Sequence, residues 1–153
     1  MSNGTKVKKR DGRIEALDLE KMHLMVEEAT RGLAGVSASQ VEMKSGIQFY
    51  DGITTAEIQE ILIKAASDLI DLDHPNYQFV AARLLLFALR KQLYGKMREM
   101  PHLEPHIMNC TNIDVYDKEI FAKYSKEEID KANSFIDHDR DFLFTYAGLR
   151  QVV

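Results

Sequence analysis

Four basic side chains within six residues near the start of the sequence are the first candidates for chemistry, and they are Lys8, Lys9, Arg10 and Arg13. Cations this close together repel one another unless water solvates them or an anion is shared between them. Composition alone favours a solvated, charged edge that discourages aggregation. The alternative is a clamp for phosphate groups.

Two residues far along the chain can complete such a clamp. Thr55 lies near a predicted helix start, where the helix dipole favours anions, and Lys91 lies near a predicted helix end. Lys91 there can also simply complement the negative end of the helix dipole. Charge-assisted hydrogen bonds from separate elements can hold a polyphosphate without a glycine-rich P-loop, and the sequence has no such loop. We therefore predict that Lys9, Arg10 and Lys91 converge on a polyphosphate, with the Thr55 hydroxyl beside them.

Other candidate sites are weaker. Cys110 is the single cysteine, which excludes an internal disulfide framework and a zinc site with four cysteine ligands. His102 and His106 have the spacing of one helical face, but Pro105 lies between them and no third metal ligand is evident. The acidic cluster at residues 137–141 is expected to form a solvated turn with helix-end pairing. We expect no catalytic residues and no metal site.

A β-hairpin must position the basic cluster. Asp11-Gly12 lies between two short runs that include β-branched and other apolar residues, which is the strongest short-range signal for a hairpin. The expected strands are Val7 to Arg10 and Arg13 to Leu17. A hairpin is only marginally stable alone in water, so we expect it to lie against helices.

Four helices are predicted after the hairpin. Asp18 caps the first helix, which runs to about Gly32, and the second begins near Ser37 and ends at Asp51-Gly52, with Val41, Met43, Ile47 and Tyr50 as its apolar residues. The third begins at a capping box, Thr54 to Glu57, and its apolar stripe is Ile58, Leu62, Ala65 and Leu69. The fourth helix runs from Tyr77 to Tyr94. The fourth is apolar almost all round and must be covered on several sides. The expected fold is mainly α (α+β), a four-helix bundle capped by the hairpin.

The character of the sequence changes from Met97. Pro101 and Pro105 lie close together and the apolar periodicity weakens, which indicates a linker into new structure. We predict a first domain over residues 1–95, followed by a linker and a partial helical segment over residues 96–153. A second capping box at Ser125 and Glu128 predicts a helix from Lys126 to Ile136. From about residue 97 the chain is expected to pack poorly alone, or to pack on another copy.

Composition bounds the class of protein. The chain has 153 residues, of which 45% are hydrophobic, and its 20 basic and 24 acidic residues give a net charge of −4. This balance does not suggest a nucleic-acid partner. The longest apolar run is too short for a membrane helix, so we expect no membrane contact. Low cysteine usage fits a cytoplasmic setting.

Several stretches, in this order and spacing, resemble the ATP-cone at the N-terminus of the large subunit of class I ribonucleoside-diphosphate reductases. They are residues 9–12, residues 15–21, residues 51–55 and residues 77–95. The resemblance continues past the cone, because residues 135–141 and 144–146 are similar to the opening of that subunit's helical domain. It covers nearly the whole chain.

The resemblance implies a regulatory site that binds ATP as activator or dATP as inhibitor, with Mg²⁺. The phosphate-side positions it implies are Lys9, Thr55 and Lys91, with Arg10 as a further candidate. The nucleoside-lining segment it implies consists of Glu15, Ala16, Leu17, Asp18, Leu19, Glu20 and Lys21. Gln59 stands where related cones can carry a histidine.

The resemblance also implies partners. Because the reductase's catalytic barrel lies beyond these residues, we expect this chain to be inactive alone and to sense nucleotides for deoxyribonucleotide synthesis. The implied partners are the rest of the large subunit, in cis or in trans if the gene is split, and the radical-bearing small subunit. Homo-oligomers are also possible.

Two other functions are open to a chain of this kind. ATP-cones also occur in DNA-binding repressors, but these need a zinc ribbon that a single cysteine cannot furnish. Alternatively, the basic hairpin of a helical protein-interaction module can dock an acidic partner with no nucleotide dependence.

Overall fold

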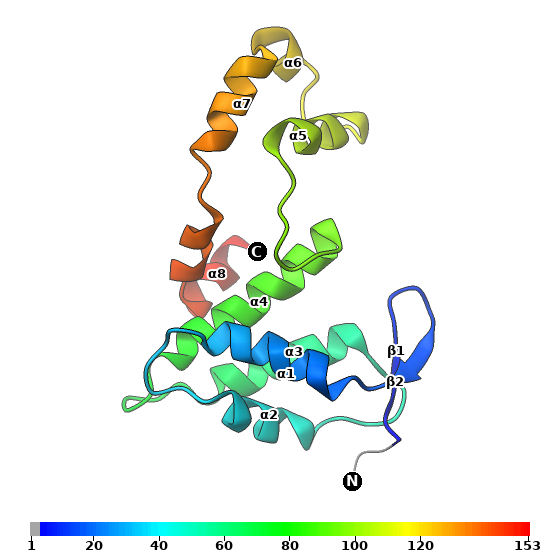
Figure 1. Ribbon diagram of the computed structural model, residues 1–153, viewed down its shortest axis with the longest axis vertical. Helices are drawn as coiled ribbons and strands as arrows, with labels where there is room; N and C mark the ends of the chain where they lie inside the picture. Colours follow the sequence, from blue (N-terminus) through cyan, green and yellow to red (C-terminus); the bar gives the residue numbers. More distant parts are fainter. Residues whose placement is uncertain (1–3) are drawn as a thin grey trace. The chain divides into compact units, whose positions relative to one another are not determined.

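The computed structural model describes residues 4–153, and this part of the chain is mainly helical (Figure 1). Its elements are β1 (Lys6–Lys8), β2 (Ile14–Ala16), α1 (Leu19–Thr30), α2 (Ala38–Gly46), β3 (Ile53–Thr54), α3 (Thr55–Ser67), α4 (Tyr77–Tyr94), α5 (Leu103–Asn112), α6 (Glu119–Lys123), α7 (Lys126–Ser134), the 3-10 helix η1 (His138–Leu143) and α8 (Tyr146–Val152). Among the described residues, no helix has the length and apolar character needed to cross a membrane.

The chain divides into two compact units. Unit 1 consists of residues 4–89 together with residues 142–153, and unit 2 consists of Arg90–Asp141. The predicted domain boundary at residue 95 stays a prediction. The segment Phe142–Val153 clusters with the first helices, whereas the chain from about residue 97 was expected to pack poorly alone or on another copy.

The predicted hairpin is confirmed, with shorter strands and a different turn. The Lys9 N–H donates to the Arg13 carbonyl at 2.8 Å, and the Gly12 N–H donates to the Lys9 carbonyl at 3.0 Å. Gly12 has a φ of 87°, whereas Asp11 does not have a positive φ. The loop therefore has three residues, with glycine in the left-handed position, and is not a two-residue Asp-Gly turn.

A third strand joins the hairpin to the bundle. β3 pairs in parallel with β1, with Val7 opposite Ile53 and Lys8 opposite Thr54, and the strand order is β2-β1-β3. β3 ends at Thr54 and α3 begins at Thr55. The sheet thus fixes the hairpin directly beside the start of α3.

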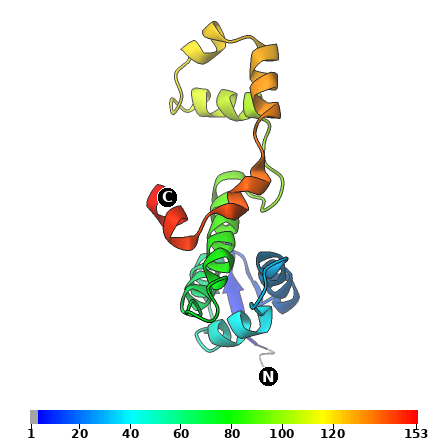
Figure 2. The ribbon, with the colours of Figure 1, turned by 90° about the vertical axis from the view of Figure 1, so that its left-hand side faces the viewer.

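α4 is the central helix, and its predicted bounds are confirmed. No residue from Tyr77 to Lys91 is exposed, so neighbours cover the helix on every side. Figures 1 and 2 show α1, α2 and α3 gathered around its N-terminal part. The hydroxyl of buried Tyr77 donates to the Gln40 side chain at 2.6 Å and accepts the Ser37 N–H at 3.0 Å, which ties α4 to the start of α2. The four-helix bundle capped by a hairpin is confirmed.

The prediction for α2 was wrong in its length and its apolar face. The helix ends at Gly46, and its buried residues are Val41 and Ser45, four positions apart. Met43 is two positions from Val41, which places it on the opposite face, and it is 72% exposed. Ile47 and Tyr50 lie beyond the helix end and are also exposed.

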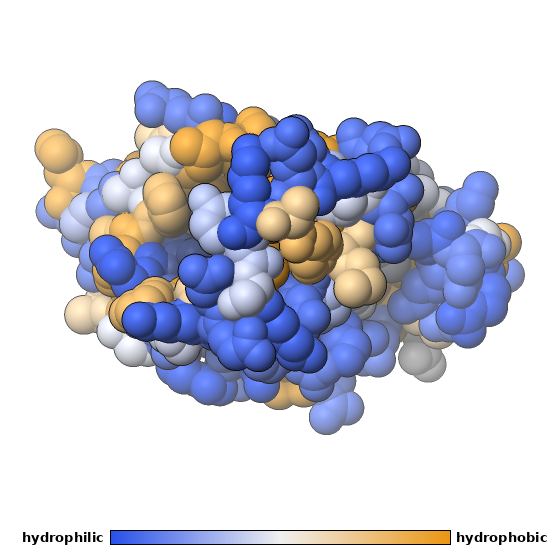
Figure 3. All heavy atoms as spheres, turned by 90° about the horizontal axis from the view of Figure 1, so that it is seen from above, coloured by the Kyte–Doolittle hydropathy of each residue, from blue (hydrophilic) through white to orange (hydrophobic). Residues whose placement is uncertain are grey.

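On the face drawn in Figure 3, hydrophobic residues form small patches between hydrophilic ones.

Unit 2 has a small core. Ile107 of α5 and Ile129 of α7 are buried. The capping box predicted at Ser125 is present, and α7 ends at Ser134, two residues before the predicted end. Arg90, in the last turns of α4, donates to the Asp141 carboxylate at 2.8 Å. Asp141 of the acidic cluster therefore pairs with a buried arginine.

Candidate functional site

The charges at the hairpin tip are partly paired with one another. The Arg13 guanidinium lies 2.7 Å from the Asp11 carboxylate and 3.0 Å from Glu15, and the Lys9 ammonium lies 3.5 Å from Glu15. Hydrogen bonds from the Arg13 backbone and side chain lower the pKa of Asp11, and Asp11 in turn raises the pKa of Arg13. Arg13 is thus bound to the hairpin's own carboxylates.

Arg10 joins the hairpin tip to α3. Its Nη2 donates to the Oε1 of Gln59 at 3.5 Å, across a separation of 49 residues. Gln59 is only 8% exposed. Thr55 lies four residues before Gln59, so both side chains share one face of α3. The structure thus brings Arg10 to Gln59, and Thr55 lies one turn earlier on the same face of α3.

The start of α3 is rigidly capped. The Thr54 hydroxyl accepts the Glu57 N–H at 3.1 Å, and the Glu57 carboxylate accepts the Thr54 N–H at 2.8 Å, which confirms the predicted capping box. The Tyr50 hydroxyl donates to the same carboxylate at 2.9 Å. Hydrogen bonds from Thr54 hold the pKa of Glu57 below its usual value. The first turn of α3, which begins at Thr55 and carries a partial positive charge, is therefore held in place.

The predicted nucleoside segment forms the end of β2 and the first turn of α1. Asp18 caps α1 as predicted, because its carboxylate accepts the Lys21 N–H at 2.9 Å. The Leu17 N–H donates to the Thr5 carbonyl at 2.9 Å, which continues the hairpin pairing. Ala16 ends β2 opposite Lys6. This segment is thus ordered by backbone hydrogen bonds.

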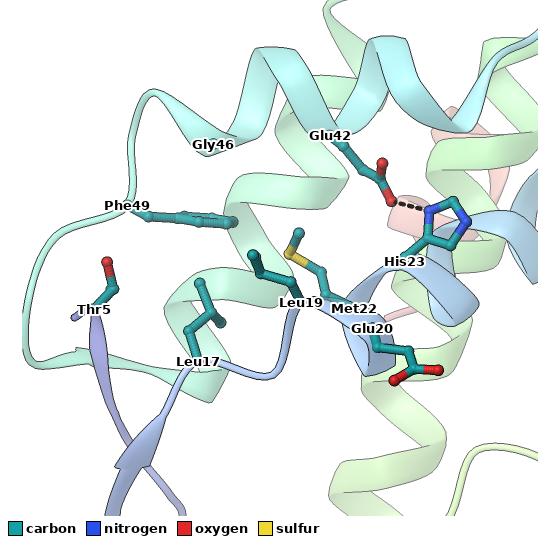
Figure 4. A pocket seen from close by; sticks show the side chains of 9 residues that line it. All are labelled: Thr5, Leu17, Leu19, Glu20, Met22, His23, Glu42, Gly46 and Phe49. Atoms are coloured by element: carbon teal, nitrogen blue, oxygen red, sulfur yellow. Dashed lines mark hydrogen bonds and ion pairs between the residues drawn. The ribbon is translucent and has the colours of Figure 1, made fainter. Parts of the chain in front are cut away.

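Part of this segment lines a cavity of about 670 Å³ between α1 and α2 (Figure 4). Its lining consists of Thr5, Leu17, Leu19, Glu20, Met22, His23, Glu42, Gly46 and Phe49. Figure 4 shows the apolar side chains of Leu17, Leu19, Met22 and Phe49 directed toward one another. None of the described residues Lys9, Arg10, Thr55 and Gln59 is in the lining. Leu17, Leu19 and Glu20 thus line this cavity, and whether they share a site with Arg10 stays a prediction.

The rim of this cavity carries an ion pair that sequence analysis missed. His23 Nδ1 lies 2.7 Å from the Glu42 carboxylate. The hydrogen bond to Glu42 raises the pKa of His23. The two residues come from different helices, so no local sequence signal could have revealed the pair.

Lys91 lies in the last turn of α4 and belongs to unit 2, whereas Lys9, Arg10 and Thr55 belong to unit 1. The convergence of Lys91 with Lys9 and Thr55 stays a prediction. Gly95 ends the helix with a φ of 72°, and its N–H donates to the Lys91 carbonyl at 3.0 Å.

His102 and His106, at the start of α5 and within it, take part in helix capping and ring packing. His102 occupies the N-cap position of α5, and the His106 ring packs edge-on against Tyr94 and Tyr116. The Cys110 sulfur lies 3.7 Å from His106. Within residues 4–153, no group of three or more side chains is arranged to hold a metal ion.

Comparison with known proteins shows the family to which the chain belongs. The ATP cone domain family matches residues 5–92. The ribonucleoside-diphosphate reductase 1 subunit alpha of Escherichia coli strain K12 is 47% identical over 152 residues, which is 99% of this chain and 20% of that protein. The corresponding alpha subunits of Haemophilus influenzae and of enterobacteria phage T4 are 45% and 41% identical, over 99% and 94% of this chain and 20% and 19% of their own lengths. The chain spans about a fifth of the length of the curated relatives it matches. We conclude that the chain belongs to the ATP cone family and is similar to the N-terminal region of ribonucleoside-diphosphate reductase alpha subunits.

Proposed function

We propose that unit 1 binds ATP or dATP as an allosteric effector, with the triphosphate beside the hairpin tip and the start of α3. The observation that supports this proposal is the contact between Arg10 and Gln59, because it links one cation of the hairpin to the capped helix α3. Membership of the ATP cone family implies a nucleotide effector.

In this proposal each predicted residue has a role. Lys9, Arg10 and Lys91 donate charge-assisted hydrogen bonds to phosphate oxygens, and the Thr55 hydroxyl donates another. The segment Glu15 to Lys21 lines the nucleoside, partly through its backbone. Mg²⁺ accompanies the nucleotide and is held mainly by phosphate oxygens and water, as is usual for this ion.

Nucleotide binding requires Lys9 to exchange partners. Its ion pair with Glu15 lies at the surface, and such pairs contribute about 0–1 kcal/mol. A hydrogen bond to a charged group contributes about 1.5–3 kcal/mol. The exchange of Lys9 from Glu15 to a phosphate oxygen is therefore favourable. The ion pair with Glu15 is too weak to compete strongly with a phosphate group for Lys9.

We further propose that nucleotide binding here controls the overall activity of ribonucleotide reduction, and hence deoxyribonucleotide synthesis. The catalytic chemistry then belongs to the rest of the alpha subunit, in cis or in trans if the gene is split. Nucleotide occupancy would alter assembly with the radical-bearing small subunit, or the homo-oligomeric state.

Calorimetric titration with ATP and with dATP tests the proposed site. Saturable binding is expected for the wild-type chain. The double variant Lys9→Ala, Lys91→Ala should lose ~3 kcal/mol or more, which is roughly a hundredfold in affinity. The matched control is Lys44→Ala, Lys64→Ala, which removes the same charge from lysines that contact Asp68 and should bind normally.

Two results would contradict the proposal. One is the absence of saturable nucleotide binding by the wild-type chain. The other is equal affinity in the two double variants, because net charge alone would then explain the effect. Salt-sensitive capture of an acidic partner, unaffected by dATP, would instead support the protein-interaction module.

A further inference from the structure

Arg83 of α4 binds the C-terminal end of α1. Its Nη1 donates to the Arg31 carbonyl at 2.8 Å and to the Ala29 carbonyl at 3.2 Å. The last carbonyls of a helix lack intrahelical partners, and a cation beside them is favourable. α1 has no basic residue in its own last turn. Arg83 therefore supplies from α4 the charge that α1 lacks.

The same guanidinium also contacts the returning C-terminal segment. Its central carbon lies 5.4 Å from the centroid of the Phe142 ring, within the range of a cation–π interaction. Phe142 packs edge-on against Phe87 of α4, at 6.1 Å between ring centroids and an interplanar angle of 74°. The single side chain of Arg83 thus joins the end of α1 to the first residue of the segment Phe142–Val153.

The surroundings of Arg83 leave its guanidinium little freedom. Its Nε is buried and makes no hydrogen bond to any described residue. Burial lowers the pKa of Arg83, and the Glu28 carboxylate opposes that shift. A shift of the α1 carbonyls would therefore displace a guanidinium that those carbonyls and the Phe142 ring hold.

α1 connects Arg83 to the proposed effector site. Its first turn follows Asp18 and contains Lys21, both in the proposed nucleoside segment, and the helix has 12 residues. At 1.5 Å per residue it is about 18 Å long. A hydrogen-bonded helix moves largely as one body, so a displacement of its first turn reaches the carbonyls that Arg83 binds.

We infer that Arg83 transmits nucleotide occupancy from α1 to the segment Phe142–Val153. This inference rests on the proposed function and adds the route by which the site acts on the rest of unit 1. Arg83 is a positioning residue, because it acts through α1. A second polar contact of this segment, the ion pair of Arg150 with Glu60 of α3 at 3.3 Å, is exposed and is expected to couple weakly.

Hydrogen exchange on the whole chain, with and without saturating ATP, tests the inference. In the wild type, amide exchange over residues 142–153 should change about fivefold or more on ATP binding, as typical coupling requires. Arg83→Met keeps an unbranched side chain but removes the donors and the charge. It should bind ATP with an affinity close to that of the wild type and lose the response of residues 142–153. The matched control, Glu60→Gln, should keep the response.

The outcomes separate this inference from the proposed function. If ATP binds to the wild type without changing amide exchange over residues 142–153, or if Arg83→Met keeps that change, the inference is wrong while the proposed binding site is unaffected. If Arg83→Met loses ATP affinity as strongly as the Lys9 and Lys91 variant, Arg83 is a binding residue and the inference is wrong. If it fails to fold, Phe142→Leu decides, because it keeps the bonds of Arg83 to α1 and should lose the response. If the wild type shows no saturable ATP binding, both the proposed function and this inference are wrong.

Discussion

Gln59→Leu is the most direct perturbation of the proposed effector site. The change removes the oxygen that accepts the Arg10 guanidinium and keeps a buried side chain of similar size. The side chain at position 59 then no longer holds the Arg10 guanidinium. We expect weaker ATP binding with little change in the free energy of unfolding.

The geometry sets the size of the effect. A hydrogen bond to a charged group contributes about 1.5–3 kcal/mol, but the distance of 3.5 Å from Arg10 Nη2 to Gln59 Oε1 is at the long limit. Immobilising a long side chain on binding costs about 0.5–1.5 kcal/mol, and a pre-positioned Arg10 avoids part of that cost. Both arguments give about 1 kcal/mol, which is about a fivefold loss of affinity.

A double-mutant cycle measures this contribution. ATP affinity is determined by calorimetry for the wild type, Arg10→Ala, Gln59→Leu and the double variant. Because Gln59 acts through Arg10, the coupling free energy should be about 1 kcal/mol. Gln48→Leu is the matched control, since the amide of this exposed glutamine donates to the Lys44 carbonyl at 3.4 Å in α2, outside the proposed site. Additivity of the two changes within about 0.3 kcal/mol would refute the positioning of Arg10 by Gln59.

Three further predictions concern the scaffold. Leu62→Ala should lower the free energy of unfolding in urea by about 2–5 kcal/mol, because Leu62 is 0% exposed; a loss below 1 kcal/mol would contradict the assigned core. Thr54→Ala should cost about 1 kcal/mol through the lost cap of α3, and an unchanged urea midpoint would contradict that role. The ion pair of His23 with Glu42 raises the pKa of His23, so its stabilisation is complete below the unfolded pKa of about 6.5 and disappears as pH rises through the folded pKa. The Tm difference between wild type and Glu42→Gln should therefore be larger at pH 5.5 than at pH 8.5, and a pH-independent difference would exclude this ion pair.

Local signals made much of unit 1 predictable from the sequence. The cap of α1 at Asp18 and the capping box of α3 each depend on residues three apart, so the sequence contains the whole interaction. The apolar run of α4 predicted both its bounds and its burial. The Asp11-Gly12 pair located the hairpin, although the loop has three residues.

Interactions between segments far apart in the sequence determine the parts of the fold and of the candidate site that could not be predicted. β3 has two residues, which is too short for a periodic signal, and its partner is 46 positions earlier in the pairing of Val7 with Ile53. The return of Phe142 to Phe87 likewise depends on packing that no local window contains. The basic residue types predicted a candidate phosphate site. The contact of Arg10 with Gln59 required the structure.

Two apolar residues determine where the hairpin cations lie. Val7 and Ile53 are register partners in the parallel pair and are both buried. A slip of one residue would turn Val7 out of the core, so burial strongly specifies this register. With the register fixed, Lys8 lies opposite Thr54. Lys9 and Arg10 follow directly at the hairpin loop, and Arg10 contacts Gln59 of α3. The hydrophobic effect at one residue pair thus holds the charges that the proposed nucleotide requires.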